Sequence, residues 1–488
     1  MHFLRHKSVL HISEILLYIC IGFIVSTAIC LWFQFSFITN SFLIGLFLSI
    51  NILLFYGDKR KILILFCFSV GGLLAILNFY RFNLSHNFCD LKSEERLILK
   101  VISVPKTKKF SKEAFAISET GYKYKINLSK HAEIYYGSII EGLCEKNKPK
   151  NYGSFDYASY LKSKGVKCVC NLKDYKIIGN SNDLFSKLAN LRRLSENNVS
   201  KVIPNPQAAL ANGLLFGGDD RLSDEMRQNF SLTGMTHIVA VSGYNVSVIV
   251  FVVIFVGIYI GLTRKMASIL ALILIFLFVA MIGFPASGVR AGIMGSIIIF
   301  ALLSGRVGNW VNILIFACAV MIIFNPFILR YDIGFQLSFL ATLGIFTIYP
   351  IFERIIKPKN IVLSALWEIL LLTLSVQLLV LPIIIYNFHI FSVSSFITNL
   401  LILPILPFTM FFVFLCVIFG FLNNFLSMIF GWLAYFLLSY EVEVIKFFAN
   451  QIWSYIIIND IKAYILWIYY GILLFALYYL DKFLDKRS

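Results

Sequence analysis

The chain has 488 residues, of which 59% are hydrophobic and 16% aromatic, and its formal net charge at pH 7 is +17. Its mean hydropathy of +0.81 lies far above that of soluble domains and excludes a soluble globular protein. The composition therefore predicts a polytopic α-helical membrane protein.

Apolar runs long enough to cross a bilayer recur along the chain. Three lie near the N-terminus and nine follow a long polar stretch, so we expect about twelve spans. Several runs are short or interrupted by Gly, Ser or Pro, and their order is better defined than their number. The runs lie near 12–33, 40–56, 61–80, 238–262, 266–283, 289–304, 310–325, 333–351, 363–387, 394–420, 425–448 and 463–480.

Basic residues in the short loops predict the orientation of these spans. If Arg5 and Lys7 lie in the cytoplasm, every second connection is basic and also lies inside, whereas loops 34–41 and 387–394 carry almost no basic charge. This arrangement indicates a multi-pass protein of a bacterial cytoplasmic membrane with both termini cytoplasmic. The first run is long and no cleavage pattern follows it, so we interpret it as a span and not as a removable signal. The inside cluster comprises Lys59, Arg60, Lys61, Arg264, Lys265, Arg306, Arg354, Lys357, Lys359, Lys482, Lys486 and Arg487.

The polar stretch 81–205 is large enough to form a domain with its own core, after the N-terminal spans of 1–80. It contains short alternating segments typical of strands, at 97–104, 114–118, 123–128, 139–144, 166–171 and 175–178. Residues 155–162 have helical spacing, with Asp156 placed to begin the helix. A small extracytoplasmic β-barrel of the oligonucleotide-binding (OB) type accounts for this pattern, although other small β folds account for it about as well.

The same region carries 19 Lys and 4 Arg against 12 acidic residues, a net charge of +11. Lys and Arg are usually enriched in cytoplasmic loops, so a basic domain outside the cytoplasm is unusual, although large domains translocate regardless of charge. Lysines interleaved with aromatic rings can follow a phosphate backbone and stack bases. The alternative is a solvated lysine-rich surface in a protein of biased composition. The candidate DNA-binding residues are Lys106, Lys108, Lys109, Lys112, Lys123, Lys125 and Lys130 with Phe110, Phe115, Tyr122 and Tyr124.

Four of the nine cysteines lie in this outward region, where disulfides form: Cys89, Cys144, Cys168 and Cys170. We expect Cys144 to pair with Cys168 or Cys170, because both segments have the pattern of strands. A zinc site is the weaker interpretation, since the sequence has no Cys-x2-Cys pair with a nearby histidine. We predict no metal site and no cofactor.

Segment 214–248 places a dense polar patch directly before an apolar run. Polar groups that lie so close to the hydrocarbon region indicate a water-filled pathway through the membrane. The alternative for the segment 206–236 is an amphipathic, interfacial helix that begins at Ser223 and ends at Gly234, either a pore collar or a surface brace. Without further acidic or histidine partners the two aspartates do not indicate a metal site. The candidate path residues here are Asp219, Asp220, Arg221, Arg227, His237, Ser242, Gly243 and Asn245.

Four spaced motifs carry a family resemblance. The stretches 151–166 (NYGSFDYASYLKSKGV), 213–248, 287–291 (SGVRA) and 332–341 (DIGFQLSFLA) together resemble the ComEC family of competence DNA-uptake channels. The resemblance covers nearly the whole chain. It implies an OB-type domain after the first spans, and then a competence-type helical domain, here 237–488, through which one strand of DNA passes.

Two departures from that family pattern stand out. Asn245 occupies the position where the family usually has a histidine, which puts a proton-moving role there in doubt. Many members also continue into a metallo-β-lactamase-like domain, whereas this chain ends at Ser488, and its seven histidines form no His-x-His-x-Asp-His cluster. We therefore expect a transport channel that is not an enzyme, with a separate nuclease.

Further path candidates lie in the later motifs. A strand crossing the membrane needs a wet lumen with few cations, so Arg221, Arg227 and Arg290 are candidate phosphate contacts. Asp332 and Gln336 share a helix face, and Ser338 points away from it. Alternatively, these polar groups hold helices together, with Asp332 paired to Arg290 or Arg330.

The sequence thus predicts an inner-membrane channel for single-stranded DNA. Its expected partners are the lipid bilayer and separate DNA receptor, nuclease and cytoplasmic motor proteins, and a homo-oligomer is compatible with the sequence. A membrane enzyme of envelope polysaccharide assembly, such as a ligase, is the alternative from another class. A secondary transporter is the third, although no two-fold repeat of broken helices supports it.

Overall fold

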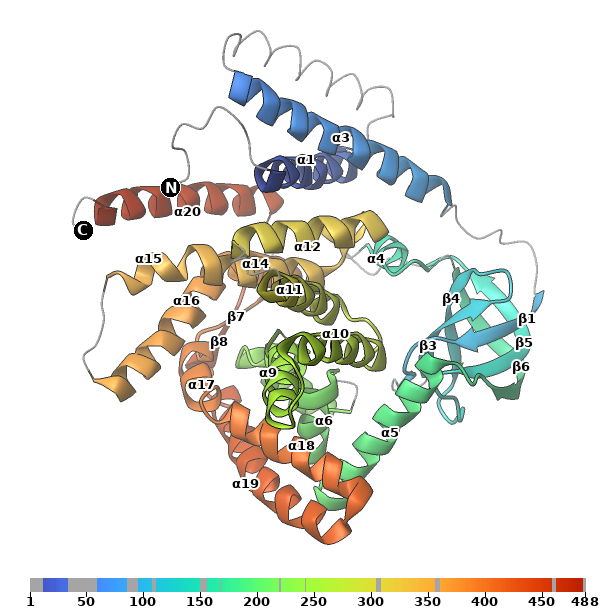
Figure 1. Cartoon of the computed structure of the whole chain (residues 1–488). Coiled ribbons are helices and arrows are strands. Elements are labelled where there is room, and N and C mark those ends of the chain that lie inside the picture. The colour runs from blue at the N-terminus through green and yellow to red at the C-terminus, as the bar shows by residue number, and fades with distance from the viewer. Residues whose placement is uncertain are drawn as a thin grey trace. The chain divides into compact units, whose positions relative to one another are not determined.

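A computed structural model describes residues 12–33, 59–85, 95–107, 111–149, 156–166, 168–218, 221–241, 243–303, 309–355, 360–458 and 462–485. The chain divides into two compact units. The first comprises Met1–Asp183 with Ser304–Gln336, and the second comprises Leu184–Leu303 with Leu337–Ser488. Figure 1 shows a mixed β-structure followed by many helices, which is the membrane protein with a barrel domain that the sequence predicts.

The barrel lies in the first unit. Its strands are β1 (Glu95–Val101), β2 (Lys106–Thr107), β3 (Ser111–Ser118), β4 (Lys123–Ser129), β5 (Ser138–Asn147) and β6 (Cys168–Asn180). They are ordered β1-β5-β6-β4-β3-β2, and an additional pairing of β1 with β3 closes the sheet. Among the described strands of the barrel, β4 and β6 are the one parallel pair. Five of these strands close into a small barrel.

Strand alternation builds the barrel interior. In β3 the side chains alternate between half-buried and buried, so Ala114, Ala116 and their neighbours on β4 and β5 face inward. One sequence prediction was wrong. The two segments 166–171 and 175–178 form a single long strand, β6, because the backbone passes through positive φ at Asp174 without ending its pairing to β5.

The predicted helix within this region is present as α4 (Tyr157–Ser163). The Asp156 side chain accepts a hydrogen bond from the amide of Ser159 at 3.0 Å, which is the N-cap that the sequence predicts. The helix lies between β5 and β6 in the chain.

Helices α1 (Ile12–Phe33), α3 (Lys59–Ser85), α12 (Trp310–Phe324) and α13 (Ile328–Tyr331) complete the first unit. Helices α1 and α3 lie side by side in Figure 1. A Cβ added to Gly22 would lie 2.0 Å from the Phe68 carbonyl oxygen, and one added to Gly71 would lie 2.0 Å from that of Ile19. The two glycines therefore permit the close helix contact that membrane proteins favour.

The second unit is helical. It contains α5 (Leu184–Val202), α6 (Gln207–Phe216), α7 (Asp224–Leu232), α8 (Thr236–Val239), α9 (Gly243–Tyr259), α10 (Arg264–Met281), α11 (Ala286–Leu303), α15 (Tyr349–Glu353), α16 (Ile361–Phe388), α17 (Ser395–Ile402), α18 (Leu406–Leu422), α19 (Asn424–Ala449) and α20 (Ala463–Asp485). Between the two units the chain runs through α14 (Ile333–Thr347). Strands β7 (Ile390–Ser392) and β8 (Tyr455–Ile457) pair antiparallel, and the short 3-10 helix η1 (Ile452–Ser454) precedes β8.

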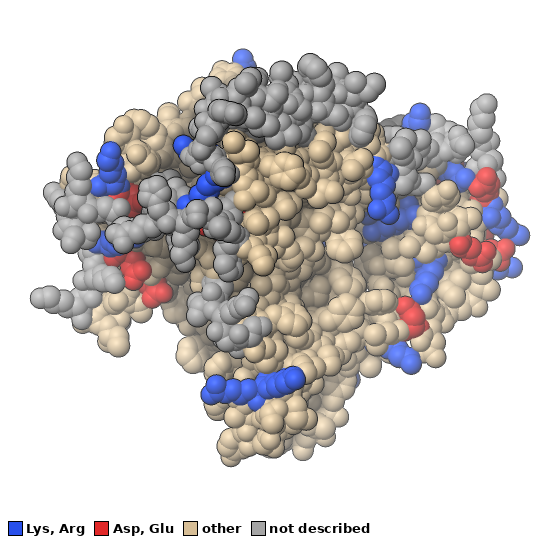
Figure 2. All heavy atoms as spheres, turned by 45° about the horizontal axis from the view of Figure 1, so that its top comes forward, with Lys and Arg blue, Asp and Glu red and all other residues tan. Residues whose placement is uncertain are grey.

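Fewer helices meet the length and hydropathy of a span than the sequence has predicted runs. Among the described residues, seven helices are long and apolar enough to cross a membrane, or eight if the bent pair α17–α18 is one span. Helices form at every predicted run in the described part, but α9, α11 and α12 are shorter than a span requires. The predicted run 40–56 lies outside the described residues. Figure 2 shows a broad face that is largely free of charged side chains, as lipid contact requires.

Helix α7 begins and ends near the predicted positions, with the Ser223 hydroxyl accepting from the Met226 amide at 3.2 Å. The predicted interfacial role was wrong in one respect. Leu222, Met226 and Phe230 are at most 4% exposed and lie in the core of the second unit with residues of α6, α18 and α19. The apolar stripe of this helix is covered by protein, so it is not available to a membrane surface.

Candidate functional site

Strand β4 carries two of the predicted DNA-binding lysines. Because successive side chains point to opposite faces, Lys123 and Lys125 lie outside the barrel while Tyr124 points inward and is 6% exposed. The expectation that Tyr124 stacks a base was therefore wrong, since its ring belongs to the barrel core.

Helix α4 covers the outer face of β4. Lys123 donates to the carbonyl of Lys164 at 2.8 Å, and Lys125 donates to the Tyr157 hydroxyl at 2.7 Å and pairs with Glu113 at 3.0 Å. Burial and the neighbouring Lys164 ammonium lower the pKa of Lys123 to about 8. Burial also lowers the pKa of Lys125, but its bonds to Tyr157 and Glu113 reverse the shift and leave that pKa raised. Neither lysine is the open phosphate contact that was predicted.

A second group of predicted lysines lies at the opposite end of β4. In the strand register, Lys106 of β2 lies opposite Glu113 of β3, and the Lys112 ammonium donates to the Ala132 carbonyl at 2.6 Å. Lys106 and Lys130 are exposed. We call Lys106, Lys112 and Lys130 the basic edge of the barrel. Tyr122, 46% exposed, lies at the turn between β3 and β4, while Lys108, Lys109 and Phe110 lie outside the described residues.

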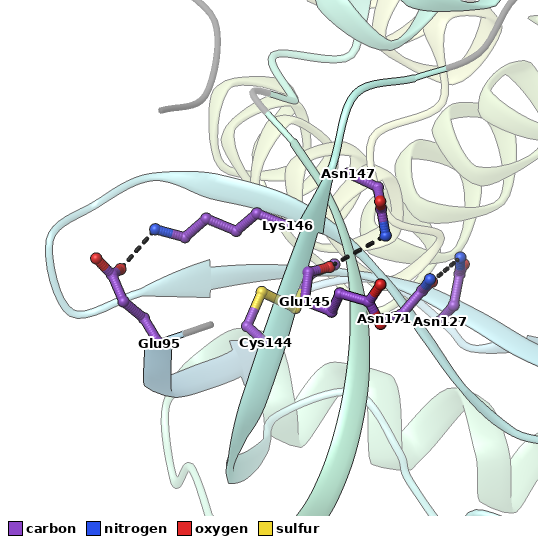
Figure 3. Close-up of a disulfide and its surroundings, with 8 residues drawn as sticks. Glu95, Asn127, Cys144, Glu145, Lys146, Asn147 and Asn171 are labelled. Atoms are coloured by element: carbon purple, nitrogen blue, oxygen red, sulfur yellow. Dashed lines mark hydrogen bonds and ion pairs between the residues drawn. A yellow bond between two sulfur atoms is a disulfide. The ribbon is translucent and has the colours of Figure 1, made fainter. Parts of the chain in front are cut away.

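A disulfide joins β5 to β6 through Cys144 and Cys170, one of the two pairings expected from the sequence. Figure 3 shows it beside the ion pair of Lys146 with Glu95, whose Nζ and Oε2 atoms are 2.5 Å apart. Both bridged cysteines are fully buried in the barrel core. The bridge ties together two strands that are antiparallel neighbours.

The motif at 332–341 serves to join elements of the first unit. Asp332 is 6% exposed and caps α14, with its Oδ1 accepting from the Phe335 amide at 3.2 Å. Its Oδ2 accepts from Lys164 Nζ at 2.6 Å. The predicted partners, Arg290 and Arg330, were therefore wrong. Gln336 lies one helical turn after Asp332, to whose carbonyl its backbone amide donates at 3.1 Å, and its side-chain amide donates to the carbonyls of Leu329 and Arg330 at 3.0 and 2.8 Å.

Further contacts join α4 to the helices of the first unit. Asn325 donates to the carbonyl of Ser163 at 2.6 Å, and Lys162 lies 4.4 Å from the centre of the Phe327 ring. Lys162 also donates to Asn83 at 2.6 Å. The motif at 151–166 and the motif at 332–341 thus meet in space, although they lie far apart in the sequence.

In the second unit, the glycines of segment 213–218 permit a close approach to residues 239–241. A Cβ on Gly213 would lie 2.4 Å from Val239 Cγ1, and one on Gly217 would lie 2.5 Å from Val241 Cγ2. Asn245 is 8% exposed, and its amide donates to the carbonyl of Leu214 at 2.9 Å. The Asn245 side chain therefore holds the start of α9 against the end of α6, so this residue has a structural role.

A buried ion cluster holds the loop that follows α6. Glu196 of α5 is 5% exposed and accepts from Arg192 Nε at 2.8 Å and, through its other oxygen, from Arg221. Arg192 also donates to the carbonyl of Gly217 at 3.0 Å. Arg221, predicted as a phosphate contact, is thus already paired with a carboxylate. Asp219 and Asp220 lie outside the described residues.

Arg290 of α11 is buried, at 8% exposure, and binds α14. Its guanidinium donates to the carbonyl of Ser338 and to the hydroxyl of Thr342, and it lies 5.8 Å from the centre of the Phe339 ring. No carboxylate pairs with it among the described residues, and its Nε and the Ser338 hydroxyl have no hydrogen-bond partner there. The guanidinium therefore ties two helices of the second unit together.

Two further predicted path residues, Arg227 and His237, lie on α7 and α8. His237 is exposed, and its Nδ1 donates to the carbonyl of Gly234 at 3.0 Å, which leaves Nε2 as an acceptor. Arg227 pairs with the exposed Asp224 at 3.2 Å. Gly243 begins α9, and Ser242 lies outside the described residues. Across the described ranges, no group of three or more His, Cys, Asp or Glu residues could hold a metal ion.

Sequence reasoning missed two residues that organise these sites, Lys164 and Glu196, and a third buried ionisable residue outside them, Glu441. The partners of Lys164 and Glu196 are distant in sequence, at Asp332 and Arg221, so no local pattern marks them. Glu441 does carry a local signal, because it is an acidic residue within the apolar run 425–448.

Comparison with known proteins identifies the helical part. A family model described as "Competence protein" matches residues 214–483. ComE operon protein 3 of Bacillus subtilis (strain 168) is 26% identical over 268 residues, which cover 54% of this chain and 33% of that relative. The chain thus aligns with about a third of the length of this curated relative. No solved structure matches.

Proposed function

This chain belongs to the competence protein family, and we propose that it conducts single-stranded DNA across the cytoplasmic membrane in transformation. The observation that carries the proposal is the family match over residues 214–483, which includes the polar motifs at 214–248, 287–291 and 332–341. The family match does not favour the alternative of an enzyme of polysaccharide assembly.

We assign the first contact with DNA to the barrel. We assign this five-strand barrel to the OB type, which binds single strands in many proteins, and the region 81–205 carries a net charge of +11. Since α4 covers Lys123 and Lys125, the basic edge of Lys106, Lys112 and Lys130 is the better candidate surface. Lys108, Lys109 and Phe110 continue this edge in the sequence.

The proposed orientation places the barrel outside the cytoplasm and both termini inside. Two observations support it: the basic short loops alternate along the chain, and the barrel contains a disulfide between Cys144 and Cys170, which persists in an oxidising compartment. A cysteine introduced at Lys106 should react with a membrane-impermeant maleimide added to intact spheroplasts. Reaction only after the membrane is opened would refute this orientation.

We assign transport, and no catalytic step, to this chain. His237 is exposed and Arg227 is partly exposed, and these two residues of the 214–248 motif are the candidates for direct contact with the moving strand. Arg290, Asp332, Gln336 and Asn245 support the path indirectly, because each joins two elements through hydrogen bonds. A separate nuclease and a cytoplasmic motor would act beside the channel.

The test of the function is uptake of labelled DNA by a deletion strain. The strain should bind DNA at its surface but fail to protect it inside the cytoplasm, and the intact gene supplied in trans should restore uptake. Normal cytoplasmic DNA in the deletion strain would refute the channel role.

The test of the barrel surface is DNA binding by the purified full chain. Exchanging Lys106 and Lys130 for Gln should weaken binding to single strands and reduce the slope of log affinity against log salt by about 0.7 for each lost phosphate contact. The control is Lys201→Gln, an exposed lysine on α5. An unchanged salt slope in the double variant would exclude the basic edge.

A further inference from the structure

A buried carboxyl group lies inside α19 and takes no part in the sites above. Glu441 is 0% exposed, and Leu438, Val442 and Ile445 of the same helix are equally buried. Helix α19 is one of the candidate membrane spans, and Glu441 lies in its interior, eight residues before the last helical residue, Ala449. An ionisable side chain inside a span is expensive and therefore points to a function.

The carboxyl group has one hydrogen bond. Its Oε1 lies 2.6 Å from the Thr409 hydroxyl of α18, which in turn lies 3.4 Å from the Ile405 carbonyl oxygen. Its Oε2 is buried without a hydrogen-bond partner in the described part of the chain. The environment of Glu441 is thus apolar apart from a single hydroxyl group.

Among the residues that the structure describes, no positive charge compensates Glu441. Helices α6 and α17, which pack against α19, carry no titratable group, and α18 carries only the thiol of Cys416. None of the charged or titratable groups on α19 itself, α5 and α7 bonds to Glu441 within the described residues. These groups are Tyr435, Tyr440, Glu443 and Lys446 of α19, Lys187, Arg192, Arg193, Glu196 and Lys201 of α5, and Asp224, Glu225 and Arg227 of α7.

These contacts fit a neutral carboxylic acid. An ionised carboxylate without a partner costs several kcal/mol in such a place, so the group keeps its proton. The neutral acid can donate from Oε1 to the Thr409 hydroxyl, which then donates to the Ile405 carbonyl, and every donor in this chain has an acceptor. Loss of the proton would leave a charge that a single hydroxyl must stabilise.

The hydrogen-bonded chain ends at a break in the helix. Helix α17 ends at Ile402 and α18 begins at Leu406, with a bend of 53° between them, and Ile405 and Thr409 flank the first turn of α18. Discontinuous helices are where membrane transporters place their coupling ions, because the broken backbone leaves polar groups exposed there. The carboxyl group and the bend therefore form one unit.

We propose that Glu441 is a proton-binding site that controls the bend between α17 and α18. The protonated side chain holds the start of α18 through Thr409. On release of the proton, the Thr409 hydroxyl turns to donate to the carboxylate and gives up its bond to the Ile405 carbonyl, which favours a different bend. The proposal rests on the proposed function for its role, which is to couple passage of the strand to the transmembrane proton gradient, but the binding site itself does not depend on DNA.

The binding test uses the purified full chain in lipid nanodiscs without DNA. Infrared spectroscopy at neutral pH should show the carbonyl stretch of a buried protonated carboxyl group, and Glu441→Gln should abolish that band. Glu443→Gln is the matched control, since Glu443 lies two residues away, is exposed and pairs with Lys446 at 3.4 Å. Glutamine is neutral and of equal size, so the variant should fold, which its abundance and monodispersity check.

Three results would overturn the site: no such band in the natural chain, a band that persists in Glu441→Gln, or a band that sodium ions abolish at constant pH, since the ligand would then be sodium. The coupling role is tested separately in cells. DNA uptake by Glu441→Gln should lose the dependence on the proton gradient that the natural chain shows, and retained dependence would refute coupling. Absence of uptake in the natural chain would overturn the channel function while leaving the infrared result intact.

Discussion

The ion pair of Lys164 with Asp332 gives a quantitative prediction. Exposed ion pairs contribute about 0.2–1 kcal/mol, whereas breaking a buried pair costs about 3–5 kcal/mol. The Asp332 side chain is 8% exposed and that of Lys164 is 30% exposed, so this pair lies between those limits. We expect Asp332→Asn to lower the free energy of unfolding by about 1–3 kcal/mol.

The two roles of Asp332 can be separated. Asparagine can still accept a hydrogen bond from the Phe335 amide as an N-cap, whereas alanine cannot. Asp332→Ala should therefore cost about 1 kcal/mol more than Asp332→Asn. Lys164→Met should cost less than Asp332→Asn, because Lys164 is close to Lys123 and its removal relieves repulsion between two ammonium groups.

The assay is a double-mutant cycle on SDS-induced unfolding of the purified full chain. The coupling energy between Asp332→Asn and Lys164→Met should be about 1–3 kcal/mol. The control cycle uses Glu443→Gln and Lys446→Met, an exposed pair for which we expect less than about 0.5 kcal/mol. Additivity of the first pair within about 0.5 kcal/mol would refute the idea that this contact docks α4 on the helices.

Three further predictions concern other residues. Arg290→Ala should lower the abundance of the protein in the membrane because the hydrogen bond to Thr342 is lost, and Arg290→Lys should retain part of that abundance. Neutralising Asp332 in addition should not restore abundance. Full abundance and normal DNA uptake in Arg290→Ala would contradict this prediction. The pKa of Lys123 is lowered, so the folded chain loses this proton first and stability should rise as pH increases from about 8 towards 10.5; thermal unfolding across this range should show a smaller rise in Lys123→Met, and an identical rise would exclude Lys123 as the cause. Exchanging Cys144 and Cys170 for Ser should lower stability by about 2–4 kcal/mol in the same unfolding assay, and an unchanged midpoint would show that the bridge contributes nothing.

The sequence by itself determined the elements whose signals are local. Strand alternation identified β3, β4 and β5, Asp156 and Ser223 marked the starts of α4 and α7, and mean hydropathy identified a membrane protein. Four motifs in order were sufficient to indicate the family, which the match over 214–483 confirms. These features depend on neighbouring residues, so a linear pattern contains them.

Only the tertiary structure decided which partner each polar residue takes. Asp332 binds Lys164, 168 positions away, and Arg221, in the loop after α6, binds Glu196 of α5, while the lysines of β4 lie under α4. A buried charge takes whichever donor the fold brings within about 3 Å, and sequence spacing beyond one helical turn carries no information about that distance. The depth of Glu441 and the absence of a cation beside it, among the described residues, follow from the packing of α18 on α19 and not from the apolar pattern of either helix.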